Sequence, residues 1–303
     1  MEFLLGTHID FLGHRRAAFI LSAVLIGAGL ISLAVHGGPK QGIDFSGGVL
    51  LQVQFERPVP AESIRQTLAG IGLGDAEIQH FGNGREAIIR TRAAEGEDLT
   101  GAIVAALNAA NPGNQADIRR EELVGPKVGG ELRATATLAI IYALIGMLIY
   151  ISLRFEFKFA VGAVAALIHD VLVTLGMFSL TGREISLPVI AAFLTVVGYS
   201  LNDTIVVYDR IREDRRKLYG RSFVDIVNTS INETLSRTLI TSLTTLIVVV
   251  CLFFLGGEVI KDFAFALMVG VIVGTYSSIY VASPLVVEWQ IHAEGRRRRR
   301  HKK

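Results

Sequence analysis

Two aspartates lie within apolar runs that are long enough to cross a membrane. Asp203 interrupts residues 196–212 (VVGYSLNDTIVVYDRIR), and Asp170 follows His169 in an earlier run. Insertion scales assign an aspartate at the centre of a membrane helix a cost of roughly 2.5 to 3.5 kcal/mol, so such a residue indicates a function. We expect Asp203 to take up and release a proton.

Arg237 is the candidate for controlling that proton. It immediately precedes another apolar run, and Thr241 continues its face one helical turn later. Because a nearby guanidinium stabilises a carboxylate, moving Arg237 relative to Asp203 would change whether the acid holds a proton. The alternative is an arginine that only extends towards the membrane surface.

Other polar residues have helical spacing relative to these groups. A polar stripe that should face protein or water is predicted before and beside Asp203, at Thr195, Tyr199, Ser200 and Asn202. Asp170 has two interpretations, an interhelical hydrogen bond or part of a proton relay, and His169 is interpreted as a packing or hydrogen-bonding residue. Gly270 and Gly274 form a GxxxG pattern typical of a close helix contact.

The composition favours a membrane protein. Hydrophobic residues make up 51% of the 303 residues, and runs of about 20 such residues match a hydrocarbon core of roughly 30 Å. Six spans are predicted, at residues 17–36, 134–153, 159–180, 185–208, 238–256 and 264–287. We expect the first span to be a retained anchor, because its apolar core is too long for a cleaved signal.

Lysine and arginine in the short flanking segments predict the orientation. They lie at Arg15-Arg16 before the first span, at Arg154 and Lys158 between the second and third, and from Arg210 to Lys217 after the fourth. We therefore expect the N-terminal segment 1–16, the connection 209–237 and the tail 288–303 to be cytoplasmic. The last eight residues carry seven positive charges in a chain of net charge +2. We expect this basic tail to contact anionic lipids, and no nucleic acid is expected as a partner.

Residues 37–133 are predicted to fold as an extracytoplasmic domain. Strand-like alternation at 48–55, 76–81, 85–92 and 115–124 is interrupted by helical patterns at 60–73 and 97–110. The order β-α-β-β-α-β is that of a ferredoxin-like split βαβ fold. The expected fold class is therefore an α-helical membrane protein of six transmembrane helices with an inserted α+β ferredoxin-like domain.

The sequence offers no motif for nucleotide or metal chemistry. It contains no GxxxxGK[ST] pattern, and no His, Cys, Asp or Glu set in residues 37–133 has metal-ligand spacing. We therefore expect neither an enzyme nor a cofactor, and no nucleotide that drives the protein directly. An intramembrane aspartyl protease is disfavoured because Ser-Leu-Asn, and not a GxG sequence, precedes Asp203.

A glycine-rich segment, GIDFSGG, follows the first span. From the residues alone it is a turn in which glycines permit positive φ and polar side chains bond nearby amides. Its residues of interest are Gly42, Asp44, Phe45, Gly47 and Gly48.

Four motifs in order give the chain a resemblance to a known family. GIDFSGG after the first span, VGPKVGGELR before the second, VVGYSLNDTIVVYDRIRE in the fourth and ETLSRTL before the fifth resemble the SecD/SecF family of bacterial protein-export membrane proteins. The resemblance covers essentially the whole chain. It implies half of a transporter of the resistance-nodulation-division type.

The resemblance also implies partners and roles. The other half would be a SecD subunit, and the pair would assist the SecYEG translocon, with YajC as a further partner, in the bacterial inner membrane. An exported unfolded polypeptide would be moved outward with energy from the proton gradient. Asp203 and Arg237 occupy motif positions implicated in proton conduction, and GIDFSGG would join the domain to the membrane part. Two other functions remain open, half of a proton-coupled small-solute exporter and a non-transporting scaffold.

Overall fold

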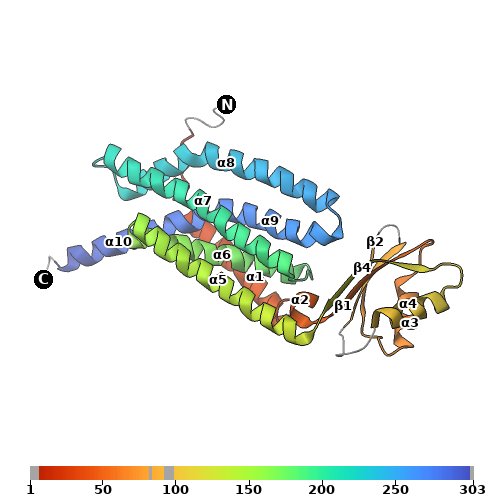
Figure 1. Ribbon diagram of the computed structural model, residues 1–303. Coiled ribbons are helices and arrows are strands. Elements are labelled where there is room, and N and C mark those ends of the chain that lie inside the picture. The colour runs from red at the N-terminus through yellow and green to blue at the C-terminus, as the bar shows by residue number, and fades with distance from the viewer. Residues whose placement is uncertain (1–6, 82–83, 92–98, 301–303) are drawn as a thin grey trace. The chain divides into compact units, whose positions relative to one another are not determined.

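The computed structural model describes residues 7–81, 84–91 and 99–300 (Figure 1). The chain divides into two compact units. One comprises Met1–Lys40 with Ala139–Lys303, and the other comprises Gln41–Leu138. Residues 82 and 83 lie outside the described residues, and Gly84 follows them with a φ of 77°.

The smaller unit contains one four-stranded antiparallel sheet. Its strands are β1 (Gly48–Phe55), β2 (Glu77–Phe81), β3 (Glu86–Thr91) and β4 (Ala116–Val124), in the spatial order β2-β3-β1-β4. Since β3 lies between β1 and β2, and β1 lies between β3 and β4, each βαβ unit is split by a strand from the other. This is the ferredoxin-like arrangement that the sequence predicts.

The helices α3 (Ala61–Ala69) and α4 (Leu99–Ala110) cover one face of this sheet (Figure 1). The side chains of β1 alternate between its two faces, and Val49, Leu51, Val53 and Phe55 are buried with Ile64, Leu68, Ile103 and Leu107 of the helices. Polar residues such as Gln52 and Glu86 lie on the other face and hydrogen-bond to each other. The alternation of the sequence thus places the main core of this unit on one face, while Leu50 and Ile88 of the opposite face are buried with Ile43.

The glycine motif forms a single helical turn, α2 (Ile43–Ser46), directly before β1. Gly47 and Gly48 follow it with φ values of 71° and 140°, which explains why both residues are glycine.

Six helices among the described residues are long and apolar enough to cross a membrane. They comprise α1 (Arg15–Val35), α5 (Pro126–Arg154), α6 (Phe157–Leu180), α7 (Leu187–Lys217), α8 (Phe223–Leu255), and the run formed by α9 (Glu258–Ser277), η1 (Ser278–Ala282) and α10 (Ser283–Arg300). In the larger unit α6, α7 and α9 pack against one another, while α1 packs on α6 and α8 packs on both α7 and α9. The short π-helix η1 lets the last span continue without a break.

Two polar segments contain more helix than the predicted spans include. Within the connection 209–237, α7 continues to Lys217 and α8 begins at Phe223 after the cap residue Ser222. Ion pairs at i,i+4, including Glu213 with Lys217 at 2.6 Å, stabilise the charged end of α7 as helix. The tail 288–303 likewise continues the last helix, because α10 is helical to Arg300.

The described part of the N-terminal segment packs closely on the larger unit. Phe11 and Leu12 are buried in its core. Asn228 and Asn232 of α8 bond to the backbone of residues 9–12, with Phe11 N to Asn228 Oδ1 at 2.9 Å and Ile9 N to Asn232 Oδ1 at 2.9 Å. Residues 9–12 are therefore bound to α8 before α1 begins.

Candidate functional site

Asp203 is buried in the middle of the helix packing. It lies on α7, and only 2% of its surface is exposed. Its Oδ2 atom accepts a long hydrogen bond of 3.4 Å from Ser242 Oγ on α8. An apolar helix that buries an acid with so few partners satisfies the first requirement of a proton-binding group.

Ser242 connects Asp203 to two further hydroxyls. Tyr199 of α7 donates to Ser242 Oγ at 3.4 Å, and Thr275 of α9 reaches it at 2.7 Å. Thr275 also lies 2.8 Å from the carbonyl of Val271, and its single hydroxyl proton can serve one acceptor at a time. Hydroxyls from three helices can therefore reorient when the charge on Asp203 changes.

Arg237 lies on α8, slightly more than one turn before Ser242, and is exposed. No ion pair within 4.0 Å joins it to Asp203, and both residues are described. The structure therefore shows no direct contact between Arg237 and the acid.

Asp170 forms a second, fully buried cluster on α6. Its Oδ2 atom accepts hydrogen bonds from Ser200 of α7 at 2.5 Å and Ser277 of α9 at 2.8 Å. Its Oδ1 atom lies 2.9 Å from Nδ1 of His169, whose Nε2 lies 3.0 Å from Ser22 of α1. Four helices thus meet through one carboxyl and one imidazole, in agreement with the interpretation of His169 as a hydrogen-bonding residue.

Small residues allow the helices around these acids to approach closely. A Cβ atom on Gly274 would lie 2.9 Å from Ser200 Cβ, and one on Gly270 would lie 2.1 Å from Val196 Cγ2. The helix contact expected from the GxxxG pattern is therefore present between α9 and α7. It brings Ser277 to Asp170, and Thr275 to Ser242, the hydroxyl that contacts Asp203.

The predicted polar stripe divides in the structure. Tyr199 joins the cluster of Asp203, whereas Ser200 joins that of Asp170. Thr195 and Asn202 are exposed, and Thr195 bonds to the carbonyl of Ala191 in its own helix. Thr241 likewise bonds to the carbonyls of Arg237 and Thr238. A continuous polar path along α7 is thus absent from these described residues.

The glycine motif lies in the other unit and meets the beginning of α5. A Cβ on Gly129 would lie 3.1 Å from the nitrogen of Gly47 and 3.1 Å from the carbonyl oxygen of Phe45. Ser46 bonds to the carbonyl of Gly42 at 3.1 Å, which closes the single turn around Asp44. Both glycine motifs of the sequence therefore meet in one backbone contact, which the sequence reasoning did not foresee.

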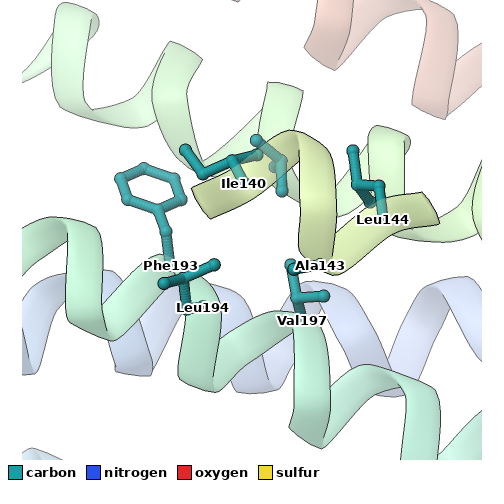
Figure 2. A pocket seen from close by; sticks show the side chains of 7 residues that line it. Ile140, Ala143, Leu144, Phe193, Leu194 and Val197 are labelled. Carbon is teal, nitrogen blue, oxygen red and sulfur yellow. The ribbon is translucent and has the colours of Figure 1, made fainter. Parts of the chain in front are cut away.

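An apolar crevice opens between α5, α6 and α7. Figure 2 shows its lining, which is formed by Ile140, Ala143, Leu144, Val171, Phe193, Leu194 and Val197. It offers no hydrogen-bonding side chain to a polar solute. Within the described parts of the chain, no group of three His, Cys, Asp or Glu residues is arranged to bind a metal ion.

Sequence reasoning missed most of the hydroxyl partners. The sequence analysis predicts no partner role for Ser22, Ser242 and Thr275, and Ser277 follows the GxxxG pattern by one turn without a predicted bond to an acid. Their common signal is a small polar residue on a buried helix face, which becomes visible only once the faces are known.

Known proteins resemble this chain along most of its length. A family model described as "Protein export membrane protein SecD/SecF, C-terminal" matches residues 103–292, and one described as "SecD/SecF GG Motif" matches residues 31–59. The protein translocase subunit SecF of Desulfurispirillum indicum is 52% identical over 93% of this chain and 92% of its own length. That of Vibrio alginolyticus is 48% identical over 94% and 91%.

A solved structure gives the same result in three dimensions. The crystal structure of SecDF, a translocon-associated membrane protein from Thermus thermophilus, matches 96% of this chain with a TM-score of 0.86 and 40% identity. The present chain spans only 40% of that longer chain.

Proposed function

Because this chain belongs to the SecD/SecF family of protein-export membrane proteins, we propose that it is an auxiliary subunit of the Sec export machinery that couples the proton gradient to late translocation. It would act in the bacterial cytoplasmic membrane as a multi-pass protein with both termini in the cytoplasm. The expected activity is transport without covalent chemistry, and protons are the only ion it would use.

The observation that carries this proposal is the environment of Asp203. A carboxyl that is 2% exposed, on an apolar helix, has a single long hydrogen bond to Ser242. Protonation changes the charge of this pocket by one unit, and the hydroxyls of Tyr199 and Thr275 can turn in response. Two helix arrangements that differ in how they solvate the carboxylate would then bind the proton differently.

The energy of one proton is sufficient for such a switch. Moving one charge through 100 mV supplies roughly 2.3 kcal/mol. At 1.36 kcal/mol for each factor of ten, this shifts an equilibrium about fiftyfold. Arg237 would set the charge state of Asp203 from α8, and Asp170 would hold α6, α7 and α9 together as the hydrogen-bonded centre.

The partners follow from the relatives. The solved SecDF chains support pairing with a SecD subunit. This chain matches only 40% and 41% of the length of those chains. We propose SecYEG as the translocon, YajC as an accessory partner and an unfolded exported polypeptide as the substrate. The segment from Gly42 to Gly48 would transmit motion to the ferredoxin-like domain, and the basic tail would contact anionic lipids.

The test is export of a secreted reporter in cells whose only copy of the protein carries Asp203→Asn. Membrane level and association with SecD serve as controls. Export at the level of a deletion, with assembly intact, is the expected result. Normal export would show that Asp203 is structural and would leave the scaffold function as the better explanation.

The same Asp203→Asn strain distinguishes the proposed function from that of a small-solute exporter. Such a protein would change the sensitivity of cells to toxic compounds while leaving secretion unchanged. We expect the reverse, a secretion defect without altered sensitivity.

A further inference from the structure

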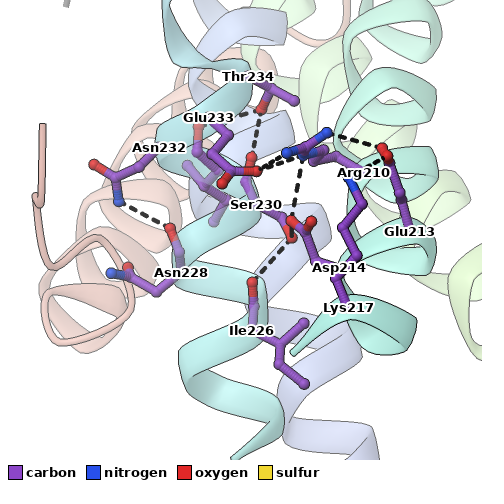
Figure 3. A network of polar contacts seen from close by, with 11 residues as sticks. Arg210, Glu213, Asp214, Lys217, Ile226, Asn228, Ser230, Asn232, Glu233 and Thr234 are labelled. Carbon is purple, nitrogen blue, oxygen red and sulfur yellow. Dashed lines mark hydrogen bonds and ion pairs between the residues drawn. The ribbon is translucent and has the colours of Figure 1, made fainter. Parts of the chain in front are cut away.

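Arg210 binds three carboxylates at the charged end of α7. It forms ion pairs with Glu213 at 2.8 Å and Asp214 at 3.4 Å on its own helix, and with Glu233 on α8 (Figure 3). Both Nε and Nη2 of the guanidinium contact Glu233 Oε2. Glu233 is therefore held towards α7.

The network carries more negative than positive charge. Lys217 pairs with Glu213 at 2.6 Å and is the second cation. Asp214 is buried and also accepts a hydrogen bond of 2.7 Å from Ser230. With every side chain ionised, three carboxylates face two cations, and one carboxylate remains able to attract a further positive charge.

Arg237 is the cation best placed to respond to that excess. It follows Glu233 by four residues on α8, a spacing at which helical side chains are neighbours, and an acid that precedes a base in this way is the favoured order. In the described part of the chain, however, Arg237 has no ion pair within 4.0 Å. Glu233 contacts Arg210 instead.

We infer that Arg210 is a positioning residue for the proton site: by holding Glu233, it keeps the guanidinium of Arg237 available to Asp203. This inference rests on the proposed function of Asp203 and Arg237. It assigns to the ion-pair network on α7 and α8 a task beyond joining the two helices.

Loss of Arg210 would release Glu233 to its neighbour on α8. Because an exposed ion pair is weak, Glu233 would withdraw Arg237 from Asp203 only part of the time. We expect Arg210→Gln to lower the export rate about two- to fivefold. We expect Glu233→Gln alone to leave it unchanged, because Arg237 then has no competing carboxylate.

The decisive strain carries both changes. If Glu233 acts as a competitor, Arg210→Gln/Glu233→Gln restores export to the rate of the unmodified protein. If the pair only joins α7 to α8, both single changes and the double change have the same defect. Glu213→Gln is the matched control, since it removes another carboxylate of Arg210 that is not a helical neighbour of Arg237.

Membrane level and association with SecD are measured for each strain. Should Arg210→Gln fail to accumulate because Asp214 is left buried without its cation, the comparison is repeated with Asp214→Asn throughout. Three results would each overturn the inference. The first is normal export by Arg210→Gln, and the second is a defect of Arg210→Gln that the added change Glu233→Gln does not relieve. The third is equal relief of that defect by the added change Glu213→Gln.

The Asp203→Asn strain separates this inference from the proposed function. If Asp203→Asn exports normally, the proposed function fails whatever the Arg210 strains show. If Asp203→Asn is inactive and the double change brings no relief, only the role of Arg210 is wrong.

Discussion

Ser200 of α7 donates a hydrogen bond of 2.5 Å to the Oδ2 atom of Asp170 on α6. Ser200 precedes Asp203 by three residues, so one turn of α7 serves both buried acids. A movement of this turn of α7 that changes the surroundings of Asp203 therefore also acts on the hydrogen bond between Ser200 and Asp170. The two clusters are mechanically linked even though no hydrogen bond joins their carboxyls, both of which are described.

Removing the hydroxyl that contacts Asp203 should impair export. Ser242→Ala deletes the hydrogen bond to Asp203 and leaves Thr275 and Tyr199 without their common partner. We expect a decrease of about two- to tenfold in export rate, as for the loss of one net hydrogen bond of 0.5 to 1.5 kcal/mol. Thr244→Ala is the control, since Thr244 is exposed on the same helix and bonds to its own backbone. Equal effects of the two changes would argue against a role for Ser242.

Asp170 should matter more for stability than for proton transfer. Asp170→Ala removes the acceptor of Ser200 and Ser277, and interhelical hydrogen bonds in membranes average about 0.6 kcal/mol. We expect a loss of about 1 to 2 kcal/mol in unfolding free energy, measured by denaturation in detergent. Asp209→Ala, which removes a half-exposed carboxylate of α7, should cost less.

Asp170→Asn distinguishes the two interpretations of this acid. The amide keeps an acceptor oxygen but cannot carry the charge. We expect nearly normal export from this variant. Loss of export with unchanged stability would instead assign Asp170 to a proton relay.

The contact between α1 and α6 tolerates no side chain at its centre. A Cβ on Gly29 would lie 2.7 Å from the Cα atom of Gly176, and backbone atoms cannot move aside easily. We expect Gly29→Ala to cost about 1 to 3 kcal/mol of unfolding free energy. Gly27→Ala on the same helix meets nothing within 4 Å and should be neutral or stabilising. The same denaturation measurement checks both variants.

Asn228 and Asn232 of α8 should slow hydrogen exchange at the backbone amides of residues 9–12. Asn228→Ala removes bonds of 2.9 Å and 3.3 Å from the amides of Phe11 and Leu12. Hydrogen exchange at these amides should become about tenfold faster, which corresponds to about 1.4 kcal/mol. Amides of α4 in the other unit are the internal reference, and unchanged protection of Phe11 would contradict the prediction.

Glu156 should contribute stability that depends on pH. Lys158, by a hydrogen bond, and then Arg215 lower the pKa of Glu156 from its usual value of 4.5 against an opposing effect of burial. A lowered pKa in the folded state means that the stabilisation is complete above the unfolded value and disappears as pH falls through the folded value. The side chain is 56% exposed, so we expect less than about 1 kcal/mol. Glu156→Gln should therefore be less stable than the unmodified chain at pH 7 and equally stable near pH 3, by chemical denaturation.

The sequence predicted the fold better than it predicted helix ends. Alternation in β1 specified a sheet with one buried face, and the order of elements was sufficient to identify the split βαβ arrangement. The continuation of α7 to Lys217 was not predicted, because its charged residues resemble a solvated connection. Pairing of Glu213 with Lys217 and of Arg210 with Asp214 makes that segment helical.

Residue type was sufficient to identify Asp170 and Asp203 as candidate site residues. It was not sufficient to identify the hydroxyl groups that bond to them. An aspartate in an apolar run is rare, whereas serine and threonine are frequent there and can bond to their own helix. Thr195, Thr241 and Thr244 do so, while Ser242 and Thr275 reach across to other helices. Only the packing of α7, α8 and α9 separates these two groups.

The binding of residues 9–12 to α8 has a consequence for how the protein is assembled during synthesis. The backbone of Ile9 and Phe11 bonds to side chains more than 200 residues later, and Arg15 pairs with Glu288 of α10 at 2.9 Å. These contacts cannot form until the last helices have left the ribosome. The first helix therefore enters the bilayer long before its final neighbours exist, and closing this N-terminal contact is among the last steps of folding.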